Sequence, residues 1–282
     1  MTPKFTRLIR FEDAQGKIHY GEAGPDWEKD LHGQTVPTYD ISDPWASEFP
    51  LTGNHVKVAK VILCPLATTP LMYAVGLNYK SHAEEAGLPI PAYPVIFTKF
   101  GDMLADPYQD IHVPPVAKSE MDYEGELCVI LAKDVKDLSD DDDISDFILG
   151  YTVGNDVSAR FWAWPKQSGT QWGLSKSFDH FGPIGPVIAS PASIPNPQNL
   201  QLKTSVNGEI RQNGNTDNMI FDIVTILKHM SRGTTLKKGS VIMTGTPDGV
   251  AACAKPQTYL KSGDLVEIEI EKIGKIGNKM VF

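Results

Sequence analysis

Two carboxylate side chains separated by one residue, Glu124 and Glu126, stand at the start of the apolar run GELCVIL. In an extended strand, residues i and i+2 point to the same face, so both carboxylates would enter one small volume. Two like charges that close together either raise one pKa or need a cation between them. The simpler alternative is an ordinary strand on which both glutamates face water. The spacing permits a cation site, and other residues must decide between the two interpretations.

A third carboxylate, that of Asp156, follows the β-like run GYTVGN. Three carboxylate oxygens at strand ends, with positions left for water and substrate, suit a hard cation such as Mg²⁺ or Mn²⁺. By itself Asp156 fits equally well as a turn residue or a helix cap. Together with the glutamate pair it predicts a site for one divalent cation.

Two further segments carry groups that could act on a substrate. We expect SHAEEAG to form a helix capped by Ser81, on which His82 and Glu85 share a face, so Glu85 could orient His82 as a general base. The alternative for this pair is a surface ion pair. Lys176 could place its ammonium beside a substrate carboxylate or enolate, or it could be an exposed loop lysine.

The overall charge favours a cation over a nucleic acid or an anionic membrane as the partner. The 282 residues carry a net charge of −9 and a pI near 5.2, whereas nucleic acids and anionic membranes attract basic surfaces.

The chain can bury a core without disulfides, and Cys64, Cys128 and Cys253 are expected to be buried thiols. The sequence shows no apolar signal-peptide core and no run of about 18 apolar residues, so we expect a soluble, cytoplasmic protein.

The elements that must position these residues are mostly short strands. FTRLIRFED, GKIHYGEAG and VKVAKVILCPL predict strands, with a loop rich in Pro and Asp before the last of them. They form a small N-terminal β module over residues 1–65. Pro65 and Pro70 mark its boundary with a larger catalytic domain over residues 66–282.

Two hairpins are expected in the larger domain. Asn207-Gly208 lies between alternating segments and predicts a two-residue type I′ turn. The alternating C-terminal segment predicts a second hairpin that turns at Gly274.

Few helices are expected there. LSDDDDISDF predicts a short helix capped by Ser139, with Asp142 at its third position, since the acidic run lacks the glycine and terminal Glu of an EF-hand. A longer helix is predicted over Met219–Met230, after a cap at Thr216 or Asp217.

Seven segments, taken in order, resemble the fumarylacetoacetate hydrolase family over roughly residues 66–282: VGLNYKSHAEEAG, FTKF, DYEGELCVIL, GYTVGNDVSAR, SKSFDHFGPIGP, VNGEIRQ and MTGTPDGV. The resemblance implies an α+β, β-rich fold, with a mixed β-roll beside the small N-terminal module, and a homodimer. It also implies that Glu124, Glu126 and Asp156 bind a divalent metal, usually Mg²⁺, with Mn²⁺ or Ca²⁺ as substitutes.

The resemblance implies roles for residues around that metal. His82 and Glu85 would form a catalytic dyad that activates water, on a segment able to close as a lid, and Lys176 would stabilise the substrate's oxygens. The substrate-binding residues would be Arg160, Thr246, Phe97, Lys99 and Ala163.

The chain departs from the family's pattern after Arg160. The family commonly has an Asp next and a Gln three residues after the arginine, whereas this chain reads Phe161, Trp162, Ala163. His180 stands where the family tends to have Thr. Apolar residues in place of a polar contact predict a wider, more apolar acyl end than an oxaloacetate site needs.

The expected function is divalent-metal-dependent hydrolysis of a carbon–carbon bond in an acylpyruvate or a related 1,3-dicarbonyl or 2-oxo acid. The alternatives are decarboxylation of an oxaloacetate-like 2-oxo acid and tautomerisation or isomerisation, including a step in a biosynthetic pathway. A noncatalytic binding protein is disfavoured because the dyad and all three metal carboxylates are present. The expected partner is thus a small 2-oxo acid or diketone, and neither a nucleic acid nor a membrane.

Overall fold

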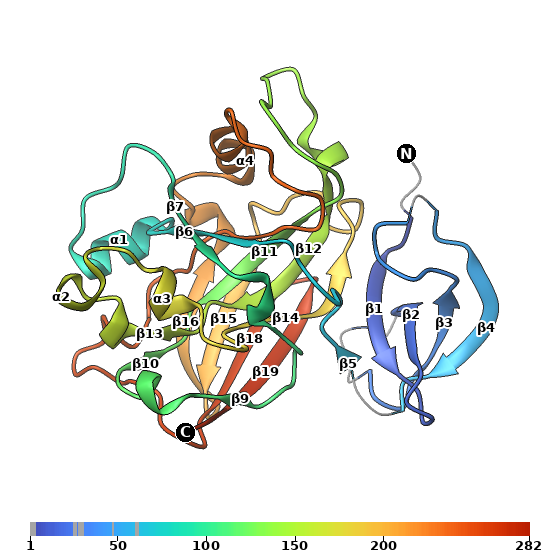
Figure 1. The fold of residues 1–282 in the computed structure, drawn as a ribbon, viewed down its shortest axis with the longest axis horizontal. Helices are drawn as coiled ribbons and strands as arrows, with labels where there is room; N and C mark the ends of the chain where they lie inside the picture. The colour runs from blue at the N-terminus through green and yellow to red at the C-terminus, as the bar shows by residue number, and fades with distance from the viewer. Residues whose placement is uncertain (1–3, 25–26, 28–30, 47, 60–61) are drawn as a thin grey trace.

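The computed structural model describes residues 4–24, 27, 31–46, 48–59 and 62–282, which form a β-rich α+β fold with mixed sheets and few helices (Figure 1). The expected fold class is therefore confirmed. Two sheets contain most of the strands, and a short pair is formed by β10 (Met121–Asp122) and β13 (Ser158–Ala159). Within the described ranges, no helix is both long and apolar enough to cross a membrane.

The larger sheet has twelve strands, and its main path runs β4-β3-β2-β1-β14-β12-β11-β17-β6-β7. β5 pairs with β1, and β8 pairs with β14. β11, β12 and β14 are buried along their whole length, as their nearly continuous apolar sequences require. The strands of this sheet are β1 (Arg7–Glu12), β2 (Ile18–Glu22), β3 (Thr35–Tyr39), β4 (Leu51–Lys57), β5 (Ile62–Leu63), β6 (Met72–Gly76), β7 (Val95–Lys99), β8 (Leu104–Ala105), β11 (Gly125–Leu131), β12 (Ile148–Asn155), β14 (Gly182–Ala189) and β17 (Val241–Met243).

The second sheet has five strands in the order β16-β15-β18-β19-β9. Asn207 and Gly208 join β15 to β16 with φ angles of 52° and 81°, which confirms the predicted type I′ hairpin. The C-terminal hairpin is also present, but its turn is centred on Lys272, and Gly274 is the first residue of the returning strand. The strands are β9 (Ile111–His112), β15 (Gln201–Val206), β16 (Glu209–Asn215), β18 (Leu265–Ile270) and β19 (Gly274–Val281).

The N-terminal strands join the rest of the molecule through β1, which pairs with β2 on one side and with β14 on the other. Figure 1 shows β1–β4 gathered at one end of the molecule. β3 and the start of β4 lie where the sequence predicts a loop, and VKVAKVILCPL contributes to two separate strands, β4 and β5. Residues 60–61 of that segment lie outside the described part of the chain. The division into domains at residue 65 stays a prediction.

The helix that carries the dyad is α1 (Lys80–Ala86), and it begins differently from the prediction. Its N-cap is Tyr79, whose side chain makes no capping bond, so the assignment of Ser81 as the cap is wrong. The backbone N–H of Ser81 donates instead to Asn218 Oδ1, which comes from a segment 137 residues away. A distant side chain therefore satisfies a donor that local capping would otherwise have to satisfy.

The longer helix, α4 (Ile223–Ser231), begins later than predicted. Its cap is Asp222, whose carboxylate accepts the N–H of Thr225, and not Thr216 or Asp217. Residues Thr216–Asn218 form a short 3-10 helix. Met219 and Ile220 then pair with the backbone of Tyr79 and Asn78, which takes them out of the helix.

The acidic segment forms a 3-10 helix over Ile144–Phe147, with Asp143 as its cap. The N–H and hydroxyl of Ser139 donate to the Asp142 carboxylate, but no helix starts there, so the predicted cap is wrong. Two one-turn helices, α2 (Pro165–Ser168) and α3 (Gly173–Lys176), follow β13. The cysteines are free thiols: Cys64 and Cys128 are buried as expected, whereas Cys253 is partly exposed.

Candidate metal centre and catalytic residues

The three carboxylates predicted to hold a metal lie together in the structure. Antiparallel pairing of β11 with β12 puts Gly125 opposite Asn155, and the N–H of Asp156 donates to the carbonyl of Glu124. Glu124, Glu126 and Asp156 are all buried, and each offers an oxygen within 4.8 Å of the other two. The strand pairing thus turns an i, i+2 spacing and a strand-end aspartate into one acidic cluster.

Gly125, between the two glutamates, allows β11 to lie against the second sheet. A Cβ at this position would lie 2.4 Å from Thr204 Oγ1 and 3.1 Å from a methyl carbon of Ile268. The glycine therefore lets two sheets meet directly behind the carboxylates, which holds Glu124 and Glu126 on a firmly packed backbone.

The electrostatics of the cluster fit a cation. Burial, and then the charges of Asp156 and Glu124, raise the pKa of Glu126 well above its usual value. Burial acts in the same direction on Glu124, but Lys176 and Arg160 outweigh it and hold the pKa of Glu124 at about 2. Lys176 also acts against the increase in the pKa of Glu126, but among the described contacts no cationic side chain is hydrogen-bonded to Glu126, whose Oε2 accepts the N–H of Gly245. A buried set of hard oxygen donors with one charge left to offset suits a divalent cation.

Two lysines contact Asp156 from different sides. Lys176 on α3 donates to Glu124 Oε2 and Asp156 Oδ2, both at 2.7 Å, and it is buried, so the exposed-loop alternative for this lysine is wrong. Lys99 on β7 is fully buried, and its Nζ donates to Asp156 Oδ1 and to the carbonyl of Phe181. The contacts of Lys99 are therefore with a carboxylate of the cluster, and its expected contact with a substrate stays a prediction.

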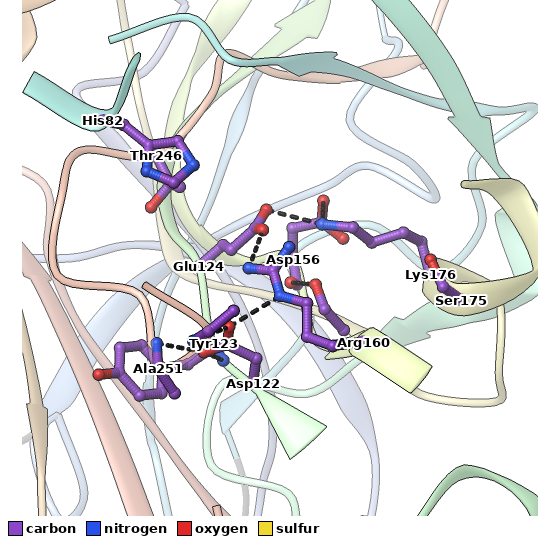
Figure 2. Close-up of polar contacts among 12 residues, drawn as sticks. His82, Asp122, Tyr123, Glu124, Asp156, Arg160, Ser175, Lys176, Thr246 and Ala251 are labelled. Atoms are coloured by element: carbon purple, nitrogen blue, oxygen red, sulfur yellow. Dashed lines mark hydrogen bonds and ion pairs between the residues drawn. The ribbon is translucent and has the colours of Figure 1, made fainter. Parts of the chain in front are cut away.

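Arg160 links the acidic cluster to Asp122, a residue that the sequence analysis missed. Its Nη2 lies 2.5 Å from Glu124 Oε1 and its Nε lies 2.8 Å from Asp122 Oδ2 (Figure 2). The buried carboxylate of Asp122 also accepts the N–H groups of Ala251 and Ala252. Asp122 therefore ties the arginine to the loop at residues 245–253. The available signal was its position two residues before Glu124, which repeats the i, i+2 spacing.

The two residues expected to form the catalytic dyad contact each other on α1, and their catalytic role stays a prediction. His82 Nδ1 lies 3.3 Å from Glu85 Oε2, with the two side chains 13% and 24% exposed. The Glu85 carboxylate also accepts the N–H of Gly249 at 3.1 Å, so this exposed residue is tied to the 245–253 loop.

Two buried amide side chains that the sequence analysis did not single out hold the loop and helix α1 in place. Asn78 bonds the carbonyls of Thr244 and Phe221 and the N–H of Phe221. Gln212 donates to Thr246 Oγ1 and accepts from the N–H of Gly125. The hydroxyl of Thr246 itself donates to the Gly125 carbonyl. Both amides lie in the segments VGLNY and VNGEIRQ, which carried the resemblance.

The remaining candidates lie around α3 and the 3-10 helix Arg160–Trp162. The ring of Phe97 is 5.3 Å from Lys176 Nζ and packs edge-on against Trp172. Ala163 ends the 3-10 helix, and its N–H donates to the Arg160 carbonyl. Trp162 donates through Nε1 to the carbonyl of Val116. The wide acyl pocket expected at Ala163 stays a prediction.

Comparison with known proteins gives consistent matches. The family described as "Fumarylacetoacetate (FAA) hydrolase C-terminal" matches residues 71–281. The human protein "Oxaloacetate tautomerase FAHD2A, mitochondrial" is 40% identical over 219 residues, covering 78% of this chain and 69% of that protein. A fumarylacetoacetate hydrolase from Exiguobacterium antarcticum has a TM-score of 0.81 at 30% identity, covering 98% of this chain and 99% of that one. A 5-carboxymethyl-2-hydroxymuconate delta-isomerase from Mycobacterium smegmatis has a TM-score of 0.79 at 31% identity, with the same coverage.

Proposed function

The chain belongs to the fumarylacetoacetate hydrolase family, and on that premise we propose that it catalyses keto–enol tautomerisation of a 2-oxo acid of the oxaloacetate type, with a divalent cation at Glu124, Glu126 and Asp156. The similar proteins are named as a tautomerase, a hydrolase and an isomerase. These reactions can share one step, the formation or protonation of an enol next to a carbonyl group. The name of the human relative favours tautomerisation over the carbon–carbon hydrolysis expected from the sequence.

The single observation that carries the proposal is that one loop joins the acidic cluster to the dyad: the Gly245 N–H donates to Glu126, and the Gly249 N–H donates to Glu85. A divalent ion held by the three carboxylates would polarise the 2-oxo carbonyl and offset the negative charge that develops on its oxygen. We expect Mg²⁺, with Mn²⁺ or Ca²⁺ as substitutes, because all the donors are carboxylate oxygens.

The proton transfers fall to His82 and Glu85. In the keto form, His82 would remove a proton from the carbon next to the carbonyl, and the carbonyl oxygen would gain a proton from the pair or from water. No carbon–carbon bond breaks, so the substrate and the product have the same atoms and differ only in the position of one proton. Glu85, fixed by the Gly249 N–H, would orient the imidazole and stabilise its protonated form.

The cationic side chains have two roles in this proposal. Lys176 donates to Glu124 and Asp156, and the third N–H of its ammonium would donate to a substrate carboxylate or enolate oxygen. Arg160 would mainly hold Glu124 in position, because its guanidinium already pairs with Asp122 and Glu124. A homodimer and a cytoplasmic location stay predictions.

A second candidate, hydrolysis of an acylpyruvate, is favoured by the partial exposure of the dyad. Water can reach His82 and Glu85, so the same pair could deliver hydroxide to a carbonyl carbon. The bond to the adjacent carbon would then break to give a carboxylic acid and an enolate.

One experiment separates these reactions. The protein, with Mg²⁺, is incubated with oxaloacetate and with acylpyruvates, while ultraviolet absorbance follows the enol and mass spectrometry follows the products. The proposal predicts that the protein speeds enol–keto exchange of oxaloacetate. The amount of oxaloacetate should fall no faster than it does without the protein. Release of pyruvate and a carboxylic acid from an acylpyruvate would favour hydrolysis, and release of CO₂ from oxaloacetate would favour decarboxylation.

A further inference from the structure

A second group of metal-ligating side chains lies on helix α1 and the 245–253 loop. His82 and Glu85 of α1 and Cys253 of the 245–253 loop each offer a ligand atom within 4.8 Å of the other two. None of these residues belongs to the set Glu124, Glu126 and Asp156. The group combines an imidazole, a carboxylate and a thiol, and the acidic cluster contains only carboxylates.

The backbone around these three side chains is held in place on both sides. His82 and Glu85 are three residues apart on one helix, so they share a face. The Gly249 N–H donates to Glu85, and the N–H groups of Ala251 and Ala252 donate to Asp122, which fixes the loop just before Cys253. The ligand atoms therefore converge without a large movement of either segment.

The donor set suits a borderline metal ion and differs from what Mg²⁺ prefers. Zn²⁺ binds thiolate, imidazole and carboxylate, whereas Mg²⁺ selects oxygen ligands in an octahedral arrangement. One thiolate and one carboxylate would offset both charges of Zn²⁺, with the thiol proton released to solvent. Burial, and then the charge of Glu85, raise the pKa of Cys253, so a metal ion that binds there must displace the thiol proton.

We propose that His82, Glu85 and Cys253 form a Zn²⁺ site separate from the acidic cluster, and that Zn²⁺ bound there inhibits the enzyme by occupying the dyad. Three protein ligands leave a fourth position for water. The binding half of this inference rests on the three side chains alone. The inhibitory half also rests on the proposed role of His82 and Glu85 in proton transfer.

Cobalt(II) tests the binding half, because a thiolate ligand gives Co²⁺ a charge-transfer absorption that carboxylates do not give. Co²⁺ is added to the Mg²⁺-loaded wild type, to Cys253→Ser and to Glu126→Gln. We expect the absorption in the wild type and in Glu126→Gln, its loss in Cys253→Ser, and its displacement by Zn²⁺. Cys64 and Cys128 remain in every variant as internal controls. Absence of the absorption in the wild type, or its persistence in Cys253→Ser, would overturn the site.

Zn²⁺ titration of turnover tests the inhibitory half, at saturating Mg²⁺ and with a chelator added afterwards to reverse the effect. Replacing Cys253 by Ser or by Ala should raise the Zn²⁺ concentration for half-inhibition by at least about tenfold, as expected for loss of a ligand. Equal inhibition of wild type and variants would overturn the inhibitory half. If the cobalt absorption appears and Zn²⁺ leaves turnover unchanged, the site stands and the proposed role of the dyad fails.

Discussion

The ammonium of Lys99 contacts the carboxylate of Asp156, and neither side chain is exposed to solvent. Lys99 Nζ lies 2.5 Å from Asp156 Oδ1, while Lys176 Nζ lies 2.7 Å from Oδ2. Burial lowers the pKa of Lys99 and the charge of Asp156 acts against that effect. The Asp156 carboxylate is thus oriented by two buried lysines, Lys99 on one oxygen and Lys176 on the other. We expect Lys99 to position Asp156.

Replacing Lys99 by Met should destabilise the fold, because it leaves a buried carboxylate with one cation fewer. The expected loss in the free energy of unfolding is about 3 kcal/mol, the lower end for breaking a buried ion pair, since Lys176 remains. Urea denaturation in the presence of a chelator measures this. A variant as stable as the wild type would show that the pair contributes nothing to the fold.

Glu126→Gln should weaken binding of the divalent cation more than it weakens the fold. The amide nearly keeps the shape of the side chain but removes one ligand charge. In excess chelator the variant should be at least as stable as the wild type, because a neutral amide avoids burying an uncompensated charge. Calorimetric titration measures the Mg²⁺ affinity, and chemical denaturation in excess chelator measures the stability of the fold. Unchanged Mg²⁺ affinity in the variant would remove Glu126 from the metal site.

His82→Ala and Glu85→Gln should each lower kcat by about 10²-fold or more, the scale of general acid–base catalysis. Glu85→Gln keeps an oxygen that can accept the Gly249 N–H, so it removes the charge while preserving the loop contact. Mg²⁺ affinity should be nearly unchanged in both variants, since neither residue belongs to the acidic cluster. Wild-type turnover in both would exclude the dyad from the mechanism.

Ala163→Gln should shift the preference of the enzyme towards smaller, more polar substrates. In the wild type, each methylene added to the acyl end should raise kcat/KM about fourfold while room remains, from about 0.8 kcal/mol per buried methylene. The glutamine should reverse this trend and leave turnover of a short substrate intact. A wild type that prefers oxaloacetate to every longer analogue would rule out the wide pocket.

The sequence was most informative where local geometry decides the structure. Alternation along β11 and the residue before it brings Glu124 and Glu126 to one face, and Asp156 follows the end of the paired strand β12. Asn207-Gly208 specifies its turn through backbone preferences alone. For the glutamate pair and for the turn, the outcome depends on residues near each other in the chain, so spacing and residue type were enough, whereas the approach of Asp156 also needs the pairing of β11 with β12.

The sequence was least informative where segments far apart in the chain come into contact. Ser81 fits a cap locally, but Asn218 takes its N–H. From the sequence alone, Asp122 resembles an ordinary loop residue. In the folded chain it accepts the N–H groups of Ala251 and Ala252, which lie about 130 residues away. The pairing of β1 with β14 is equally long-range. Such contacts depend on tertiary packing, which single-residue preferences do not contain.

The most direct test of the proposed function is the rate of oxaloacetate enol–keto exchange in chelator-treated protein as Mg²⁺ is added back. The rate should rise to saturation in the wild type and stay near the uncatalysed rate in Glu126→Gln at the same Mg²⁺ concentrations. Full activity of the wild type in excess chelator, or equal Mg²⁺ activation of the variant, would contradict the assignment of Glu124, Glu126 and Asp156 as the catalytic metal site.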